Sequence, residues 1–252
     1  MLLSIVIPCY NEEANIPTLA KKLPLVETAI KKQKHTVEWI FVDDGSKDKT
    51  HALLNKHFGK KKNTQVIKHK VNKNLGGALR TGFSKSHGDA IASMDADCTY
   101  DPLELPKMLK LLKKDVDVVV ASPYHPKGKV LGVPANRLIM SRGASLVYAL
   151  VSGVKLYTYT SMFRICRRDV IENIRFKSDG FLAIGELTLL ALINGYTVKE
   201  YPTTLATRTG GISSIKWFSF TNYKKTMAYL TLEHLNFMGY IFSQRLLWNG
   251  KR

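Results

Sequence analysis

Short apolar segments alternate with amphipathic ones through the first half of the chain, and this alternation restricts the possible folds more than any other feature. The apolar segments, rich in Val and Ile, are typical of buried strands, whereas the segments between them have the spacing of amphipathic helices. A regular alternation of strands and helices predicts an α/β fold, with a mostly parallel sheet flanked by helices on both faces. Strands are expected at residues 4–7, 39–42, 65–68, 90–94 and 116–121, and helices at 16–32, 47–58, 75–85 and 103–112.

Polar, acidic or glycine-rich segments follow four consecutive predicted strands. In a parallel sheet the carboxyl ends of the strands meet at one edge, which is where ligands bind. The segment Asp43-Asp44-Gly45-Ser46 alone fits a helix-capping turn, but its place beside three similar segments favours a binding site. The four segments are residues 8–13, 43–46, 74–78 and 95–97. In the third, Gly76 and Gly77 would permit the backbone to approach a ligand closely.

Asp95 and Asp97 are candidate metal ligands. Neighbouring carboxylates repel one another unless a cation or hydrogen-bond donors offset their charge. Two aspartates one residue apart at a strand end can point toward one hard divalent cation and leave positions for water and substrate phosphate oxygens. We therefore expect a divalent cation and a phosphorylated ligand at this strand end.

The net charge indicates an anionic partner. Lys and Arg number 38 against 20 Asp and Glu, a formal charge of +18, which favours nucleic acid, a membrane surface or a phosphorylated substrate over a merely soluble, Lys-rich surface. The chain has no zinc-ligand spacing, RNA-recognition aromatic signature or helix-turn-helix pattern, so no nucleic acid is expected as a partner. The histidines show no metal-ligand spacing either. Nine lysines stay unexplained, at positions 47, 49, 56, 60, 61, 62, 68, 70 and 73.

Three widely spaced cysteines, Cys9, Cys98 and Cys166, exclude a disulfide framework and favour a reducing compartment. No secretory signal precedes the first predicted strand. No charge-free run approaches the ~18–20 apolar residues of a membrane-spanning helix. The expected localisation is therefore cytoplasmic, without a transmembrane helix.

The composition changes after residue 214, which divides the chain into a globular domain at 1–214 and an amphipathic helical tail at 215–252. The tail interleaves aromatic and apolar residues with Lys and Arg, and Glu233 is its only acid. Such a tail suits a helix lying on an anionic membrane surface. A predicted helix at 138–151, with Arg137 and Arg142 at its start, would join that surface. Alternatively, the tail covers the sheet or forms a dimer, and the oligomeric state stays open.

In order and spacing, these segments resemble the family-2 glycosyltransferases with the Rossmann-like GT-A fold, and within them the dolichol-phosphate mannosyltransferase, or polyprenyl-phosphate glycosyltransferase, group. The resemblance runs from about residue 3 to residue 211, so residues 1–214 would form the catalytic domain. It implies metal-dependent, inverting transfer of a sugar from a nucleotide-sugar donor to a polyprenyl (dolichyl) phosphate. Its motifs are residues 5–12, 42–46, 74–78 with Gly82, 94–97 with Pro102, 136–137, 160–164, Glu186, and Pro202 with 208–213.

The resemblance assigns roles to individual residues. Asp95 and Asp97 would hold Mg²⁺ or Mn²⁺ against the diphosphate, and Arg208 would contact phosphate. Glu186 would be the base for a hydroxyl acceptor or an acceptor-site hydrogen bonder, because a lipid phosphate is already anionic and needs no strong base. The catalytic set is Asp97, Arg208 and Glu186; the donor site is Pro8, Tyr10, Glu12, Val42, Asp44, Gly77, Asp95, Ala96, Asp97 and Arg208; the acceptor site is Asn136, Arg137, Ser161 and Arg164.

Departures from the group's pattern fall mainly on the acceptor side. Thr99 stands where the group usually has a metal-holding Gln, and Pro123 replaces a phosphate-facing Arg. Thr158 and Met162 replace an Asp and a Gly. Two alternatives therefore stay open: transfer to a glycan or protein hydroxyl, and a non-catalytic nucleotide- or anion-binding module. The sequence identifies neither the sugar nor the nucleotide.

Overall fold

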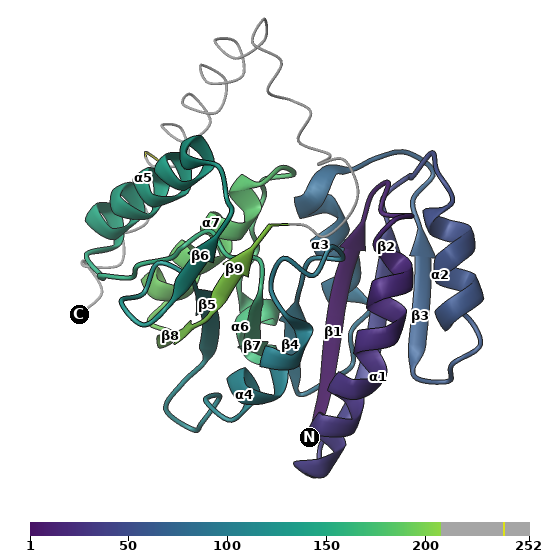
Figure 1. Ribbon diagram of the computed structural model, residues 1–252. Helices are drawn as coiled ribbons and strands as arrows, with labels where there is room; N and C mark the ends of the chain where they lie inside the picture. Colours follow the sequence, from purple (N-terminus) through teal and green to yellow (C-terminus); the bar gives the residue numbers. More distant parts are fainter. Residues whose placement is uncertain (208–238, 240–252) are drawn as a thin grey trace, which may run out of the picture.

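The expected α/β fold is confirmed. The computed structural model describes residues 1–207 and Gly239. Its main sheet has seven strands in the order β3-β2-β1-β4-β7-β5-β8, and only β7 runs antiparallel to its neighbours (Figure 1). The strands are β1 (Leu2–Cys9), β2 (Thr36–Asp43), β3 (Thr64–Lys68), β4 (Ala90–Ser93), β5 (Val118–Ser122), β7 (Arg164–Arg167) and β8 (Val198–Pro202); β6 (Lys129–Leu131) and β9 (Thr204–Ala206) form a separate pair.

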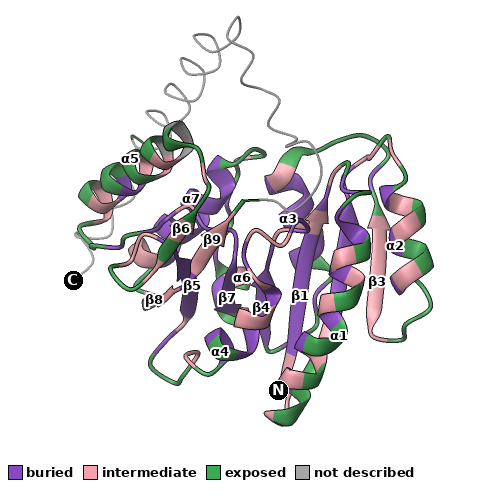
Figure 2. Ribbon diagram, in the orientation of Figure 1, coloured by how far each residue is buried: buried purple, intermediate pink, exposed green. Residues whose placement is uncertain are grey.

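Helices cover both faces of the main sheet. They are α1 (Ile16–Lys32), α2 (Thr50–Phe58), α3 (Asn74–Ser84), α4 (Leu105–Leu109), α5 (Ala135–Ser152), α6 (Arg168–Asn173) and α7 (Leu182–Ile193). Ile5 and Ile7 of β1 pack in one core with α1, α2 and α4, whereas Val6 packs in a second core with α3 and α7. The central strands are therefore buried on both sides (Figure 2), which explains their nearly continuous apolar sequences.

All five strands predicted from the sequence occur, with ends shifted by a few residues. The helix expected at 47–58 begins only at Thr50, because the preceding residues are hydrogen-bonded to the loop after β1. The helix expected at 103–112 is a 3-10 turn, Pro102–Glu104, followed by the short α4. The helix expected at 138–151 is found as α5.

The order of the first four strands places their carboxyl ends side by side. β1 lies between β2 and β4, and β3 pairs with the outer side of β2. Along the chain, β2 and β3 are thus added to the sheet on one side of β1, and β4 is then added on the other side of β1. A reversal of this kind opens a crevice at the carboxyl ends of the strands, where the predicted donor-site segments begin.

Among residues 1–207 and Gly239, no helix is both long and apolar enough to cross a membrane. The domain boundary at residue 214 lies outside the described residues, as does the tail at 215–252 except for Gly239. Both stay predictions.

Candidate active site

The loops after β1 and β2 are joined by reciprocal hydrogen bonds. Asn11 N donates to Ser46 Oγ at 3.0 Å, and Lys47 N donates to Asn11 Oδ1 at 2.9 Å. Asn11 has a φ of 54°, in the left-handed region that asparagine tolerates better than most residues. Three more bonds join Glu12 N to Thr50 Oγ1, Glu13 N to Asp48 Oδ2 and Lys49 N to Glu13 Oε2, at 2.7, 3.2 and 2.9 Å. The two loops therefore form one connected unit.

This unit contains the predicted nucleoside-binding residues. Pro8 and Val42 are partners in the pairing of β1 with β2. Tyr10 and Glu12 follow in the loop after β1, and Glu12 is buried. Asp44 begins the loop after β2 and is also buried. The fold thus brings the β1 and β2 members of the predicted donor site to one edge of the sheet.

Asp43 and Asp44 have different surroundings although they are adjacent. Asp43 is fully buried and its Oδ1 accepts a hydrogen bond from Ser46 N at 3.0 Å, which is the capped-turn role that the sequence allowed. Asp44 Oδ1 accepts from Lys73 N, in the loop after β3, at 2.8 Å. Within the described part of the chain no hydrogen bond reaches Asp44 Oδ2. That oxygen is the one through which Asp44 can accept a donor from a ligand.

Asp95 and Asp97 follow β4. Asp97 is buried and its Oδ1 accepts from Thr99 N at 3.0 Å, while Asp95 is half-buried. Burial raises the pKa of the Cys98 thiol, which directly follows Asp97, to about 11, and the negative charges of both aspartates contribute to the rise. Both carboxylates therefore lie near enough to the Cys98 thiol to act on it electrostatically.

The donor set fits a cation that binds together with a diphosphate. Among residues 1–207, no three His, Cys, Asp or Glu side chains form a complete metal cluster. Mg²⁺ and Mn²⁺ prefer oxygen ligands, and Mg²⁺ is commonly held by only one or two carboxylates plus water and substrate phosphates. Asp95 and Asp97 supply two carboxylates of this kind at the strand end.

Gly76 and Gly77 lie in the first turn of α3 rather than in the loop before it. Gly76 N donates to Asp179 O at 2.5 Å, and a Cβ added at Gly76 would overlap Ser178 O. A Cβ at Gly77 would lie only 2.6 Å from Lys73 Cβ. At Gly76, then, the close backbone approach that the sequence suggested for a ligand is made by the protein's own 178–179 segment.

Glu186 is buried within α7 and binds the chain just before that helix. Its Oε1 accepts from Lys177 N at 3.0 Å and its Oε2 from Ser178 N at 2.9 Å. The two amides thus occupy both carboxylate oxygens. Glu186 therefore positions the backbone before α7, and the two roles expected from the sequence, base and acceptor-site hydrogen bonder, stay predictions.

Ser161 and Arg164 lie in the interior. Arg164 on β7 donates from Nε to Ser161 O at 3.0 Å and from Nη1 to Thr188 Oγ1 at 2.9 Å. Burial lowers the pKa of Arg164 to about 10. Arg164 therefore connects the segment before β7 to α7.

Three predicted residues have no described side chain. Asn136 and Arg137 lie in the first turn of α5, and only their backbone is described. Arg208 lies entirely outside the described residues. The roles expected for these three residues stay predictions.

His69 is a residue of this region that the sequence analysis did not identify. It directly follows β3, is only 6% exposed, and its Nδ1 lies 2.6 Å from Asp44 Oδ1. Asp44 precedes it by 25 residues, so no local motif connects the two. The parallel pairing of β2 with β3, in which Asp43 is the partner of Lys68, brings the next residue of each strand together.

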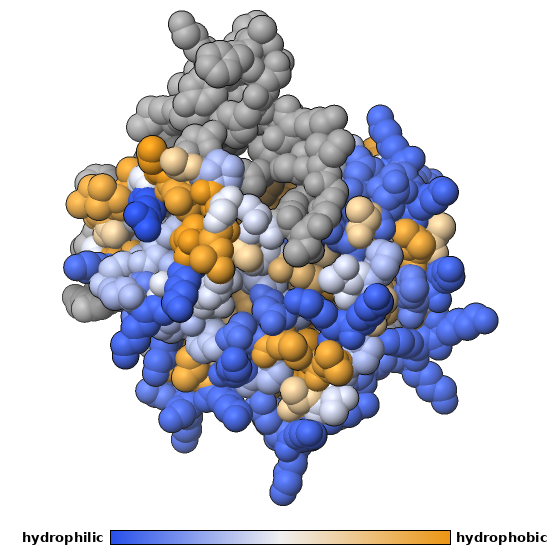
Figure 3. Space-filling view, viewed as in Figure 1, coloured by the Kyte–Doolittle hydropathy of each residue, from blue (hydrophilic) through white to orange (hydrophobic). Residues whose placement is uncertain are grey.

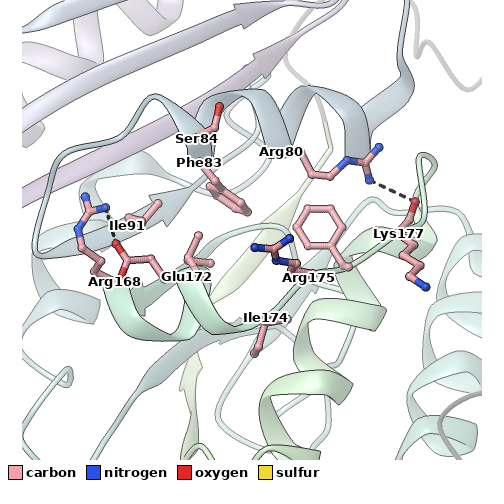
Figure 4. Close-up of a pocket in the computed structure, with 11 residues that line it drawn as sticks. Arg80, Phe83, Ser84, Ile91, Arg168, Glu172, Ile174, Arg175 and Lys177 are labelled. Atoms are coloured by element: carbon pink, nitrogen blue, oxygen red, sulfur yellow. Dashed lines mark hydrogen bonds and ion pairs between the residues drawn. The ribbon is translucent and has the colours of Figure 1, made fainter. Parts of the chain in front are cut away.

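A groove of about 670 Å³ lies away from these residues, between α3, α6 and the segment after α6 (Figure 4). Phe83 and Ile174 contribute apolar surface, and the ion pair of Arg168 with Glu172, at 3.2 Å, lies at its side. None of the predicted site residues lines it. The groove therefore gives no information on the donor site.

The nine lysines between residues 47 and 73 are all exposed. They lie along α2, β3 and the adjoining turns, at the edge of the main sheet (Figure 1). Their position shows that they contribute surface charge, and their role stays open.

Comparison with known proteins agrees with this geometry. The model of the family named Glycosyl transferase family 2 matches residues 4–175. Polyprenol monophosphomannose synthase of Mycolicibacterium smegmatis is 31% identical over 88% of this chain and 83% of its own length. Dolichol-phosphate mannosyltransferase of Pyrococcus furiosus is also 31% identical over 88% of this chain, which spans 62% of that protein. An undecaprenyl-phosphate 4-deoxy-4-formamido-L-arabinose transferase of Pseudomonas aeruginosa is 32% identical over 68% of this chain and 48% of its length.

Solved structures show the same fold. Glucosyl-3-phosphoglycerate synthase from Mycobacterium tuberculosis, in complex with Mn²⁺, UDP and phosphoglyceric acid, superposes with a TM-score of 0.64 over 86% of this chain and 72% of that one, at 19% identity. The same enzyme has been solved with Mg²⁺ and UDP. The fold and the acidic strand ends thus define a glycosyltransferase of the GT-A type. By the match over residues 4–175, the chain belongs to glycosyl transferase family 2.

Proposed function

We propose that this chain transfers a sugar from a nucleotide-sugar donor to a polyprenyl phosphate, in a metal-dependent reaction that inverts the anomeric centre. The observation that supports it most directly is the grouping of Asp44, Asp95 and Asp97 at the carboxyl edge formed by β1, β2 and β4. The relatives named for polyprenol, dolichol-phosphate and undecaprenyl-phosphate substrates support the acceptor class.

On the donor side, Asp44 Oδ2 accepts a hydrogen bond from the nucleoside, in the pocket between the loops after β1 and β2. Asp95 and Asp97 hold the cation. Bound Mg²⁺ or Mn²⁺ would offset the negative charge that develops on the leaving nucleoside diphosphate. Arg208, predicted from the sequence, would add a second positive charge to the same phosphates.

On the acceptor side, a phosphate oxygen of the lipid forms a bond to the anomeric carbon while the bond from that carbon to the diphosphate breaks. The oxygen is already anionic, so no strong base is required. Asn136 and Arg137, at the start of α5, would contact the acceptor phosphate. Ser161, Arg164 and Glu186 would position the segments around it, since the latter two bond mainly to backbone within the fold.

α5 is the element that we propose to lie on an anionic membrane surface. Ile139, Leu146 and Leu150 are 72%, 64% and 74% exposed and recur at the spacing of one helix face. Figure 3 shows apolar surface over α5. Arg142 is exposed on the same helix, and apolar side chains beside a cation suit the headgroup region. The tail at 215–252 would share this surface.

Transfer assays with labelled nucleotide sugars test the enzymatic proposal. Each donor is incubated with a polyprenyl phosphate or an oligosaccharide, with Mn²⁺ or with a chelator. Metal-dependent labelling of the lipid phosphate is expected. Labelling of the oligosaccharide alone would favour the hydroxyl-acceptor alternative, and nucleotide binding without any transfer would favour the non-catalytic module.

Vesicle flotation tests the membrane proposal. The double variant Ile139→Asp, Leu150→Asp should bind vesicles of phosphatidylglycerol and phosphatidylcholine several-fold more weakly than the wild type. Leu25→Asp is the matched control, because Leu25 is 57% exposed on α1, away from α5. Equal binding by the double variant and the wild type would contradict a role for α5.

A further inference from the structure

His69 connects three elements of the donor edge through its imidazole ring. Its Nδ1 lies 2.6 Å from Asp44 Oδ1, at the end of β2, and its Nε2 lies 2.9 Å from Thr81 Oγ1 on α3. The same hydroxyl of Thr81 also lies 3.0 Å from Gly77 O, in the first turn of α3, so its one proton is shared between His69 Nε2 and this carbonyl. Since His69 itself follows β3, the ring joins the β2 end, the β3 end and α3.

The direction of the first hydrogen bond follows from the chemistry of the partners. A carboxylate only accepts, so Nδ1 carries a proton and donates it to Asp44 Oδ1. The side chains of both residues are almost completely buried, and a bond to a charged, buried acceptor is stronger than one between neutral groups. This bond therefore constrains the rotation of the Asp44 carboxylate.

The rest of the Asp44 environment adds to this constraint. Lys73 N donates to the same Oδ1 at 2.8 Å, and Asn72 Nδ2 donates to Asp44 O at 3.1 Å. With Oδ1 committed to His69 and Lys73, Oδ2 is turned away from both and is the oxygen without a hydrogen bond in residues 1–207. His69 thus helps to determine which oxygen Asp44 presents to a ligand.

We propose that His69 is a positioning residue for nucleoside recognition: it donates to Asp44 Oδ1 so that Oδ2 faces a hydroxyl or N–H donor of the bound nucleotide. The inference rests on the proposed function, in which Asp44 contacts the donor nucleoside. His69 itself does not touch the reacting atoms. Its effect is therefore on donor affinity and not on the chemical step.

Two conservative substitutions separate the two hydrogen bonds of the ring. In His69→Asn the side-chain amide occupies roughly the place of Nδ1, so it keeps the bond to Asp44 and loses the one to Thr81. In His69→Gln the amide reaches the place of Nε2, so it keeps the bond to Thr81 and loses the one to Asp44. Because both variants lose one buried bond, a purely structural role predicts similar effects of the two on stability and affinity.

The experiment measures the Kd of UDP and GDP with Mn²⁺ by calorimetry, and the thermal midpoint of every variant. His69→Asn should bind the preferred nucleotide within about threefold of the wild type. His69→Gln and His69→Ala should bind it about tenfold more weakly, the loss expected for one hydrogen bond to a charged group. In transfer assays, His69→Gln should raise the KM for the donor and leave kcat and the acceptor KM unchanged.

His51→Ala is the matched control. His51 Nδ1 lies 3.3 Å from Asp43 Oδ2, so the preceding aspartate has a histidine neighbour of its own, and this variant should bind nucleotide like the wild type. Equal nucleotide affinity of His69→Asn and His69→Gln, or wild-type affinity of His69→Ala, would overturn the role of His69. A wild-type protein that binds neither nucleotide with Mn²⁺ would instead refute the proposed function, and the inference with it.

Discussion

Glu186 Oε2 accepts a hydrogen bond from Ser178 N at 2.9 Å, and this contact ties α7 to the segment that covers the first turn of α3. Glu186 Oε1 accepts a hydrogen bond from Lys177 N, the amide just before Ser178 N, at 3.0 Å. One residue further along, Asp179 O accepts from Gly76 N at 2.5 Å. A buried carboxylate in the second half of the chain therefore sets the position of α3, whose first turn borders the donor edge.

Replacing Glu186 with Gln distinguishes positioning from base catalysis. The amide can accept from only one of the two backbone N–H groups and turns its own NH₂ toward the other, so the free energy of unfolding should fall by about 1–3 kcal/mol. Transfer should fall less than about tenfold, since a base would contribute 10²–10⁴-fold. Urea unfolding and kcat measure the two effects.

Glu172→Gln serves as the control for that variant. Glu172 is an exposed acid of α6 that pairs with Arg168 at the surface, and its replacement should change stability by less than about 1 kcal/mol. A Glu186→Gln protein of wild-type stability that has lost transfer by 100-fold or more would show that Glu186 acts as a base.

Gly76→Ala should destabilise the protein, because the added methyl overlaps Ser178 O and lies 2.9 Å from Ala183 Cβ. Backbone must move to admit it, at a cost of roughly 2–4 kcal/mol. Gly143→Ala on α5 is the opposite case: no atom of the described residues lies within 4 Å of its added Cβ, and alanine should stabilise the helix by about 0.5–1 kcal/mol. The thermal midpoint should therefore fall for Gly76→Ala and rise for Gly143→Ala. Equal shifts of the two midpoints would contradict the packing at Gly76.

Asp97→Asn should abolish metal-dependent function while keeping the fold. Asn Oδ1 can still accept from Thr99 N, which Asp97 Oδ1 does at 3.0 Å, but a charged ligand for the cation is lost. We expect transfer to fall by about 100-fold or more and Mn²⁺-dependent binding of UDP or GDP to be lost with it. Asp115→Asn, at an exposed acid, should leave both unchanged. Turnover retained by Asp97→Asn would remove Asp97 from the catalytic set.

The fold was predictable from the sequence where local patterns determine it. Strands buried on both faces are mostly apolar, so β1, β2, β4 and β5 could be recognised from single segments. The edge strand β3 is only half-buried and could be recognised from its Val66 and Ile67. The antiparallel β7 could not, since its place between β4 and β5 arises from pairing with segments more than 40 residues away. The order of the loops then predicted that the carboxylates expected at the donor site follow neighbouring strands, as they do in the structure.

Side-chain roles that depend on distant partners were not predictable in the same way. Gly76 looked like a glycine that makes room for a ligand, but the segment that approaches it is about 100 residues later in the chain. Glu186 was expected to be a base or an acceptor-site hydrogen bonder, and its bonds to two backbone amides, which no local pattern indicates, show a third role in positioning the 177–178 segment. His69 gave no signal because its partner depends on the register of β2 and β3.

Glu38 lies at the opposite end of the sheet, and we expect its ionisation to make the stability of the protein depend on pH. Its carboxylate accepts from Ser4 Oγ at 2.7 Å, Gln65 Nε2 at 3.0 Å, and His87 N and Nδ1 at 2.9 and 2.8 Å. Burial by itself would raise the pKa of Glu38, but the hydrogen bonds from His87 and Ser4 outweigh it and bring the pKa below its usual value. The ionised form is therefore bound more favourably in the folded chain than in the unfolded one.

Because the folded pKa of Glu38 is depressed, the unfolded chain takes up its proton first as the pH falls, and stability is lost from about the usual glutamate pKa downward. At pH 7, Glu38→Gln should lower the free energy of unfolding by about 1–3 kcal/mol. The gap between wild type and variant should narrow as the pH falls from 5 toward 3, measured by urea unfolding at each pH. His87→Ala, which removes one side-chain partner and keeps Ser4 and Gln65, should lower stability at pH 7 by a smaller amount. A gap for Glu38→Gln that stays constant across this range would show that ionisation of Glu38 does not contribute to folding.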